Sequence, residues 1–253
     1  MSTKQFIRRV LYCAGFIQMA TAALLLLQAQ TPGKDGAKTV SGTETVNIYT
    51  RLTANASAGA TQLRVTSSTG FAAGDLVMIY QAQGATLNWA SNSSAYGAVT
   101  NYNNAGRYEL RGVLSIASST RINIVGTLSN SYTSSGNAQV IRVPQYTTLT
   151  IPSGATLTST AWNGQTGGIV AAEVLGACVV AGAITANGRG FRGAALTTSS
   201  SATTDYTTYR TATVAEGAEK GESIGGSTTT YDSNNGRYGR GAPANGGGGG
   251  NSH

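Results

Sequence analysis

Residues 147–193 have the sequence TTLTIPSGATLTSTAWNGQTGGIVAAEVLGACVVAGAITANGRGFRG, in which short apolar strands are separated by Gly, Asn, Ser and Thr. Apolar and polar residues alternate in 148–151 and 155–158, and small residues typical of turns follow each segment. Strands this short cannot bury their apolar side chains alone, so successive coils must stack on one another. The sequence therefore predicts the coils of a right-handed parallel β-helix over residues 145–193, with Trp162 covering one end of the stack.

Residues 46–144 carry the pattern of a small antiparallel β domain. The run LVMIY at 76–80 has apolar residues on both faces and predicts a buried strand. Pro144 ends the last strand because proline cannot donate to a β ladder. The predicted fold is all-β, with a small β-meander domain followed by the start of a β-helix and a Gly-rich, mostly irregular tail. The other segments with strand patterns are 60–65, 108–116, 121–128 and 139–143.

The first thirty residues have the pattern of a secretory signal peptide. Lys4, Arg8 and Arg9 form a basic start, and an apolar stretch over 14–27 follows it. A membrane span needs about 20 apolar residues, so this stretch is short for an anchor. We expect cleavage after residues 1–30, an exported mature chain and no membrane span after signal removal.

The two segments outside the predicted domains are polar and lack periodicity. Residues 31–45 predict a flexible lead-in. Residues 194–253 form a Ser/Thr/Gly-rich low-complexity segment that includes an unbroken glycine run at 246–250. Because the sequence stops inside this composition, we expect the native protein to continue beyond residue 253.

Charge and cysteine content limit the classes of partner. The chain has 17 Lys and Arg against 10 Asp and Glu, and three of the basic residues lie in the signal segment. The arginines are spread singly, so no basic face for nucleic acid is predicted. Cys178 is the only cysteine after the signal segment, which excludes an intramolecular disulfide. We expect its side chain to be a buried small hydrophobe, with a reactive thiol as the alternative.

The sequence contains no constellation of catalytic, metal-binding or cofactor-binding residues. The run at 188–193 matches G-x-G-x-x-G, but the polar Ser/Thr stretch after it cannot form the helix that a dinucleotide needs. Glu173 is the only carboxylate in the predicted coils, whereas glycoside hydrolysis needs a pair. The acidic residues of the tail are expected to be solvated. The sole histidine, His253, excludes histidine triads and histidine-ligated zinc.

The segment 84–106 is long, rich in Asn and Ser, and contains Trp89, Tyr96 and Tyr102. Loops of this length are uncommon without a function. Aromatic side chains beside Asn can stack on sugar rings, so these three residues are candidate glycan-binding residues. The alternative is that the rings fold back onto the small β domain.

A family resemblance rests on three stretches of the sequence. They are AGATQLRVTSSTGFAAGDLVMIYQAQG at 58–84, VPQYTTLTIPSGATLTSTAWNGQ and onward from 143, and GGSTTTYDSNNGRYGRGAPANGGGGGN from 225. They resemble the N-terminal region of large secreted, adhesin-like surface proteins of gliding bacteria. The resemblance implies a pectin-lyase-like β-helix with a glycine-rich segment, carried by type IX secretion, often with a C-terminal sorting domain; no such domain is present within these residues.

Two functions follow from these observations. The first is a non-enzymatic secreted adhesin or structural stalk at the surface of a Gram-negative bacterium. Its partners would be surface glycans or other cell-surface proteins, together with the secretion machinery. The alternative is the N-terminal part of a carbohydrate-active β-helix enzyme, a polysaccharide lyase or glycoside hydrolase, whose catalytic residues lie beyond residue 253.

Overall fold

The structure of this chain is a computed structural model that describes residues 31–195, 209–212 and 218–247. The predicted signal peptide over 1–30 lies outside the described residues. Within them strands, turns and loops dominate, and the α-helix is one short element, α2 (Thr228–Asp232). The predicted all-β fold is confirmed. None of the described helices has the length and apolar character to cross a membrane.

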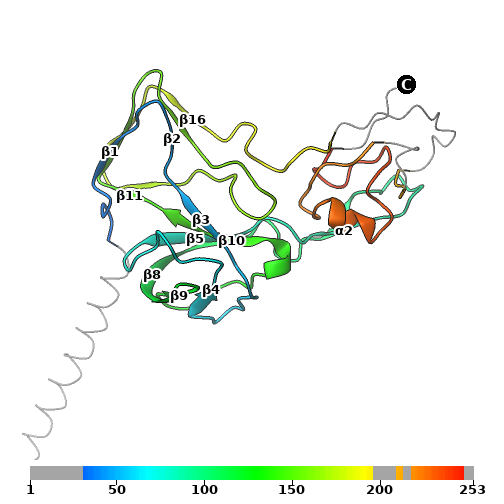
Figure 1. Cartoon of the computed structure of the whole chain (residues 1–253), viewed down its shortest axis with the longest axis horizontal. Helices are drawn as coiled ribbons and strands as arrows, with labels where there is room; N and C mark the ends of the chain where they lie inside the picture. Colours follow the sequence, from blue (N-terminus) through cyan, green and yellow to red (C-terminus); the bar gives the residue numbers. More distant parts are fainter. Residues whose placement is uncertain (1–30, 196–208, 213–217, 248–253) are drawn as a thin grey trace, which may run out of the picture.

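Short parallel strands stack as the coils of a β-helix (Figure 1). The strands of the second coil pair in register with those of the third, β11 with β14, β12 with β15 and β13 with β16. These strands are β11 (Gln145–Tyr146), β12 (Thr148–Ile151), β13 (Thr156–Thr158), β14 (Glu173–Val174), β15 (Cys178–Val180) and β16 (Ala183–Thr185).

A first coil lies on the other side of the second and precedes the small β domain in sequence. Its strands β1 (Ala37–Thr39) and β2 (Thr43–Thr45) pair in parallel with β12 and β13. The prediction of a flexible lead-in over 31–45 is therefore wrong for these strands. Lys38 and Glu44 take interior-facing positions opposite Leu149 and Leu157, and so the sequence lacks the alternation that marks a strand.

The small β domain is inserted between the first and second coils. Its six-stranded antiparallel sheet has the order β3-β10-β5-β8-β9-β4. Apolar side chains from five of the strands, among them Leu63, Ile79 and Val113, form its buried core together with residues of the connecting loops. The strands are β3 (Ile48–Arg51), β4 (Gln62–Arg64), β5 (Leu76–Gln81), β8 (Tyr108–Ser118), β9 (Arg121–Ile124) and β10 (Ala138–Val143), with a 3₁₀ turn at Ser134–Gly136 before β10.

A second, smaller lobe contains α2 and lies to the right of the coils and sheet in Figure 1. The segment 84–106 extends into it as a hairpin of β6 (Thr86–Leu87) and β7 (Val99–Asn101). Leu87 packs with Ala85 and Ala105, and Ile224 and Ala244 from the tail pack against them. The long loop of the small β domain thus forms a common core with the C-terminal segment.

A charged cluster fixes the inserted sheet to the coils. Asp75 is 2% exposed and accepts hydrogen bonds from Lys34 Nζ at 2.6 Å and Ala72 N at 2.7 Å. Arg142 on β10 pairs with both Asp75, at 3.1 Å from Nε, and Asp35. Burial alone would raise the pKa of Asp75, but these donors hold it below its ordinary value.

The third coil is open to solvent on its outer side. Cys178, expected to be buried, is exposed, as are its neighbours on β15. Its ladder partner Leu149 is 2% exposed, so the position faces the coil interior. The prediction of a buried thiol is wrong because no described segment covers the outer side of this coil.

Replacement of Leu157 by Ala tests the packing of the coil core. Leu157 is 1% exposed, and its truncation should lower the free energy of unfolding by about 2–5 kcal/mol. Ile184, its ladder partner, is 50% exposed, so Ile184→Ala is a matched control with a clearly smaller expected loss. Chemical denaturation followed by circular dichroism measures both, and equal losses would contradict an open third coil.

Candidate functional site

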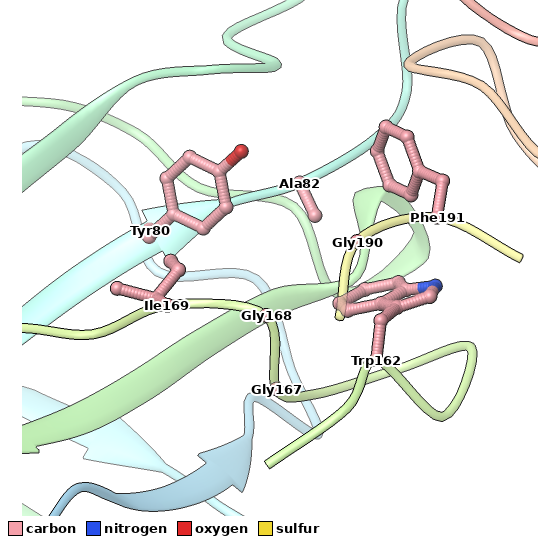
Figure 2. A pocket seen from close by; sticks show the side chains of 8 residues that line it. All are labelled: Tyr80, Ala82, Trp162, Gly167, Gly168, Ile169, Gly190 and Phe191. Atoms are coloured by element: carbon pink, nitrogen blue, oxygen red, sulfur yellow. The ribbon is translucent and has the colours of Figure 1, made fainter. Parts of the chain in front are cut away.

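A cavity of about 130 Å³ lies where the inserted sheet meets the second and third coils. Tyr80 and Ala82 line it from the end of β5, and Trp162 and residues 167–169 from the segment after β13. Residues 190–191 complete it from the segment after β16. Figure 2 shows the side chains of these residues around the cavity, with the aromatic rings supplied by three separate segments.

The three aromatic side chains of the cavity differ in their exposure to solvent. Trp162 is 5% exposed, and its indole meets the Phe191 ring edge to face, with centroids 5.7 Å apart and planes at 83°. This T-shaped arrangement is a favoured one for aromatic pairs. Tyr80 and Phe191 are half-buried, so part of each ring can contact a ligand. Trp162, predicted to cover one end of the stack, lies beside this cavity instead.

The hydroxyl of Tyr80 is the one phenol hydroxyl among the residues that line the cavity. Burial raises its pKa, so the hydroxyl is neutral and can both donate and accept at neutral pH. Among the described residues, no hydrogen-bond partner of this hydroxyl is present. A ligand in the cavity could therefore bind it without displacing a protein partner.

The wall formed by residues 167–169 is held by buried polar contacts. Gln139 is fully buried; its amide nitrogen donates to Gly167 O at 3.2 Å and its carbonyl accepts from Gly167 N at 2.9 Å. Gly167 has φ +106°, and a Cβ there would lie 2.6 Å from Ala161 O, so this backbone conformation requires glycine. Tyr49 Oη donates to Ile169 O. The wall is therefore preorganised.

A second, more polar pocket of about 190 Å³ shares Phe191 with the aromatic cavity. Glu222 lines it, is 6% exposed, and accepts hydrogen bonds from Trp162 Nε1 at 3.0 Å and Arg192 Nη2 at 2.6 Å. Burial alone would raise the pKa of Glu222, but the side-chain and backbone donors of Arg192 and the Trp162 N–H hold it below its ordinary value. Glu219 and Asn245 also line this pocket.

The tail carboxylates in this pocket were expected to be solvated, and Glu222 is not. It fixes the C-terminal segment to the coils through Trp162 and Arg192, 60 and 30 residues away in sequence. Glu219 accepts a hydrogen bond from Arg237 Nε at 2.8 Å. The sequence around Glu222 gave no signal for this role because both of its partners belong to the segments that follow the coil strands.

The three candidate residues of the 84–106 segment do not form one platform. Trp89 and Tyr96 meet with ring centroids 5.9 Å apart, inside a cluster that Tyr209 and Tyr231 complete. Tyr102 is 61% exposed and lies outside this cluster. The rings of Trp89 and Tyr96 thus pack against the C-terminal segment, which neither alternative from the sequence included.

Lys220 lies fully buried beside this aromatic cluster. Its Nζ donates to Tyr96 Oη and, at 2.6 Å, to Tyr209 O, and lies 4.4 Å from the centroid of the Tyr96 ring. Burial, followed by the charge of Arg210, lowers the pKa of Lys220 to about 7. Among the described residues no carboxylate forms an ion pair with this amine, so its positive charge is poorly compensated.

The described residues contain no group of three His, Cys, Asp or Glu side chains that could hold a metal ion. The site instead offers an aromatic cavity, a free hydroxyl, backbone groups and an adjoining charged pocket. Such a mixture of apolar walls and a few fixed polar groups is typical of small-molecule binding sites. Its residues come from segments that are distant in sequence, so no local pattern could reveal it.

Neither a known protein family nor a curated protein matches this chain. Three phage tailspike structures are similar to part of it: gp54 of Acinetobacter baumannii bacteriophage AP22, in complex with A. baumannii capsular saccharide, gp61 of Pseudomonas phage phi297 and gp49 of Pseudomonas phage LKA1. Their identities are 17%, 17% and 16%, with TM-scores of 0.28, 0.28 and 0.26. The matches cover 48%, 50% and 50% of this chain and 18%, 20% and 27% of the tailspikes, so this chain spans only a minor part of their length.

The stability of this protein should rise between pH 7.5 and pH 9 because of Lys220. The unfolded lysine keeps its proton up to its ordinary value of 10.5, whereas the folded one loses it at about 7. The unfolded state therefore binds more protons in this window, and the free energy of unfolding increases with pH. Denaturation midpoints measured across the window test this.

The variant Lys220→Met should remove most of the rise, because its side chain does not titrate. Lys38→Met is the matched control, since Lys38 is partly exposed and paired with Glu44, and it should retain the rise. A wild-type stability that is flat or falls between pH 7.5 and pH 9 would contradict a neutral buried amine.

Proposed function

We propose that this chain is a non-enzymatic, secreted cell-surface protein of a Gram-negative bacterium that binds a surface glycan. The observation that carries the proposal is the cavity between Tyr80, Trp162 and Phe191. The apolar C–H faces of a sugar fit aromatic rings, while its hydroxyls need a few fixed donors and acceptors. The Tyr80 hydroxyl and the glycine backbone of the cavity wall supply these.

The size of the cavity limits what it binds. Pockets for drug-sized ligands measure about 300–1,000 Å³, and this one measures about 130 Å³. It therefore suits one sugar unit of a longer glycan, with the rest of the glycan outside. The adjoining polar pocket, which shares Phe191, provides a direction in which a second unit could extend.

The lowered pKa of Glu222 and the existing hydrogen bonds of Glu219 and Glu222 favour glycan binding over glycan hydrolysis. A general acid in a glycosidase needs a raised pKa, and that of Glu222 is lowered. Its oxygens are already bonded to Trp162 and Arg192, and Glu219 is bonded to Arg237. The coils and inserted sheet then serve as a rigid stalk that presents the cavity.

The alternative, part of a carbohydrate-active enzyme, rests on one observation. Glu219 and Glu222 both line the polar pocket beside the aromatic cavity. If they act on a bound glycan, the chain should release reducing ends or unsaturated sugars from it. Release by the wild type that Glu222→Gln abolishes would favour the enzyme over the adhesin.

Glycan-array binding followed by titration tests the proposed function. Tyr80→Ala and Phe191→Ala should each weaken binding by at least about tenfold, or about 1.4 kcal/mol, because each removes one wall of the cavity. Both side chains are half-buried, so thermal melting of each variant checks that the fold persists.

Two controls separate this cavity from other aromatic surfaces. Tyr108→Ala removes a side chain that is 62% exposed on β8, outside the cavity, and should bind as the wild type does. Tyr102→Ala tests the exposed candidate of the 84–106 segment and should likewise leave binding unchanged. Full binding by Tyr80→Ala and Phe191→Ala, or a loss confined to Tyr102→Ala, would contradict this site.

A further inference from the structure

The two ends of the coil stack differ in chemistry. In the first coil, Lys38 lies opposite Leu149 in the ladder and Glu44 lies opposite Leu157. Lys38 Nζ and Glu44 Oε2 form an ion pair with each other. Two interior-facing positions of the first coil are thus charged, whereas Val40, directly after β1, is buried in the coil core. A polar outer face is the usual property of a capping repeat at the end of a stacked protein.

The third coil carries apolar side chains at its interior-facing positions, and Cys178 and Ile184 there take the places of Lys38 and Glu44. Val180 lies opposite Ile151, which is fully buried, and Ile184 lies opposite Leu157. Val180 and Ile184 nevertheless expose 47% and 50% of their surface. They face the coil interior and are exposed only because no described segment lies on the outer side of the coil.

The backbone at this end is also open. β15 and β16 are the terminal strands of their three-stranded sheets, so within the described part of the chain each pairs on one side only. An edge strand presents a row of unpaired N–H and C=O groups that can template another strand. Apolar interior positions and open ladders therefore occur together on the third coil.

We propose that the open end of the third coil, formed by Cys178, Val180, Ile184 and the free edges of β15 and β16, is the docking surface for a fourth coil. The occupant is an extended polypeptide segment that pairs in parallel with these strands and carries aliphatic side chains at alternate positions. The proposal does not depend on glycan binding.

The argument for this occupant is continuity with the existing interfaces. The second coil docks on the first, and the third on the second, with strands that run in the same direction and in register. A fourth coil would repeat that arrangement and bury Val180 and Ile184 as the third buries Ile151 and Leu157. A second copy stacked in register by its first coil would instead place Lys38 over Cys178 and Glu44 over Ile184, and burial of such a pair is costly.

A synthetic peptide of residues 172–187 provides the probe, because it has the chemistry that the third coil presents to the second. Cys178→Ser is used in both peptide and chain to prevent disulfides. Fluorescence anisotropy of the labelled peptide should give saturable binding, and hydrogen exchange should slow at the amides of β15 and β16.

The double variant Val180→Lys/Ile184→Glu places a positive and a negative charge at two interior-facing positions of the third coil. It should weaken peptide binding by at least about tenfold. The matched control is Leu175→Lys/Val179→Glu, which changes side chains that are 66% and 53% exposed. Val179 lies opposite Thr150, between the interior-facing positions of β15, so this variant should still bind. If the first variant fails to fold, Ile184→Lys alone replaces it.

Two results would overturn the proposal. One is the absence of binding up to about 1 mM peptide, or equal binding by both variants. The other is self-association of the chain, seen as a doubled mass in light scattering, that Val180→Lys/Ile184→Glu abolishes while the peptide has no effect. In that case a second copy, and not a fourth coil, covers this end.

Discussion

The parallel ladder between the first and second coils is the constraint on which the rest of this molecule depends. It joins segments separated by the whole inserted sheet, and Asp35 and Arg142, which pair beside it, are 107 residues apart. The entropic cost of closing a loop grows only with the logarithm of its length, so a folded insertion of this size is tolerated. The charged cluster around Asp75 then fixes the orientation of the insertion.

That constraint also builds the candidate site. Asn47, directly before β3, donates from its amide to Arg142 O at 2.9 Å and to Ala171 O at 2.6 Å, and so connects the sheet with the segment before the third coil. With the sheet fixed in this way, Tyr80 at the end of β5 lies across the cavity from Trp162 and Phe191. The cavity exists because one domain was inserted into the other, and neither part forms it alone.

The sequence predicts those parts of the fold whose apolar side chains are buried within their own segment. The alternation around Leu149 and Leu157 identifies the second coil, and the LVMIY run identifies the central strand of the sheet. It does not predict the first coil, because Lys38 and Glu44 occupy the positions that aliphatic residues take elsewhere. Alternation of apolar and polar residues therefore does not identify a strand of the end coil whose interior-facing residues are charged.

Local sequence patterns do not predict the candidate site, for a related reason. Tyr80, Trp162 and Phe191 belong to three segments, and their contacts depend on the insertion. Trp89 and Tyr96 lie in a segment that reads as a loop, yet Tyr96 contacts Lys220, 124 residues away, and Trp89 packs against Tyr231. Pairings at such separations are set by topology, which composition and periodicity do not encode.

Hydrogen exchange in residues 37–46 tests the insertion most directly. If the first coil docks on the second, its amides, including Val40 N, which donates to Thr150 O at 2.9 Å, are protected. They should lose that protection together with the amides of β12 and β13 as denaturant is added. Exchange of residues 37–46 at the rate of an unstructured chain, while β12 and β13 remain protected, would contradict the account.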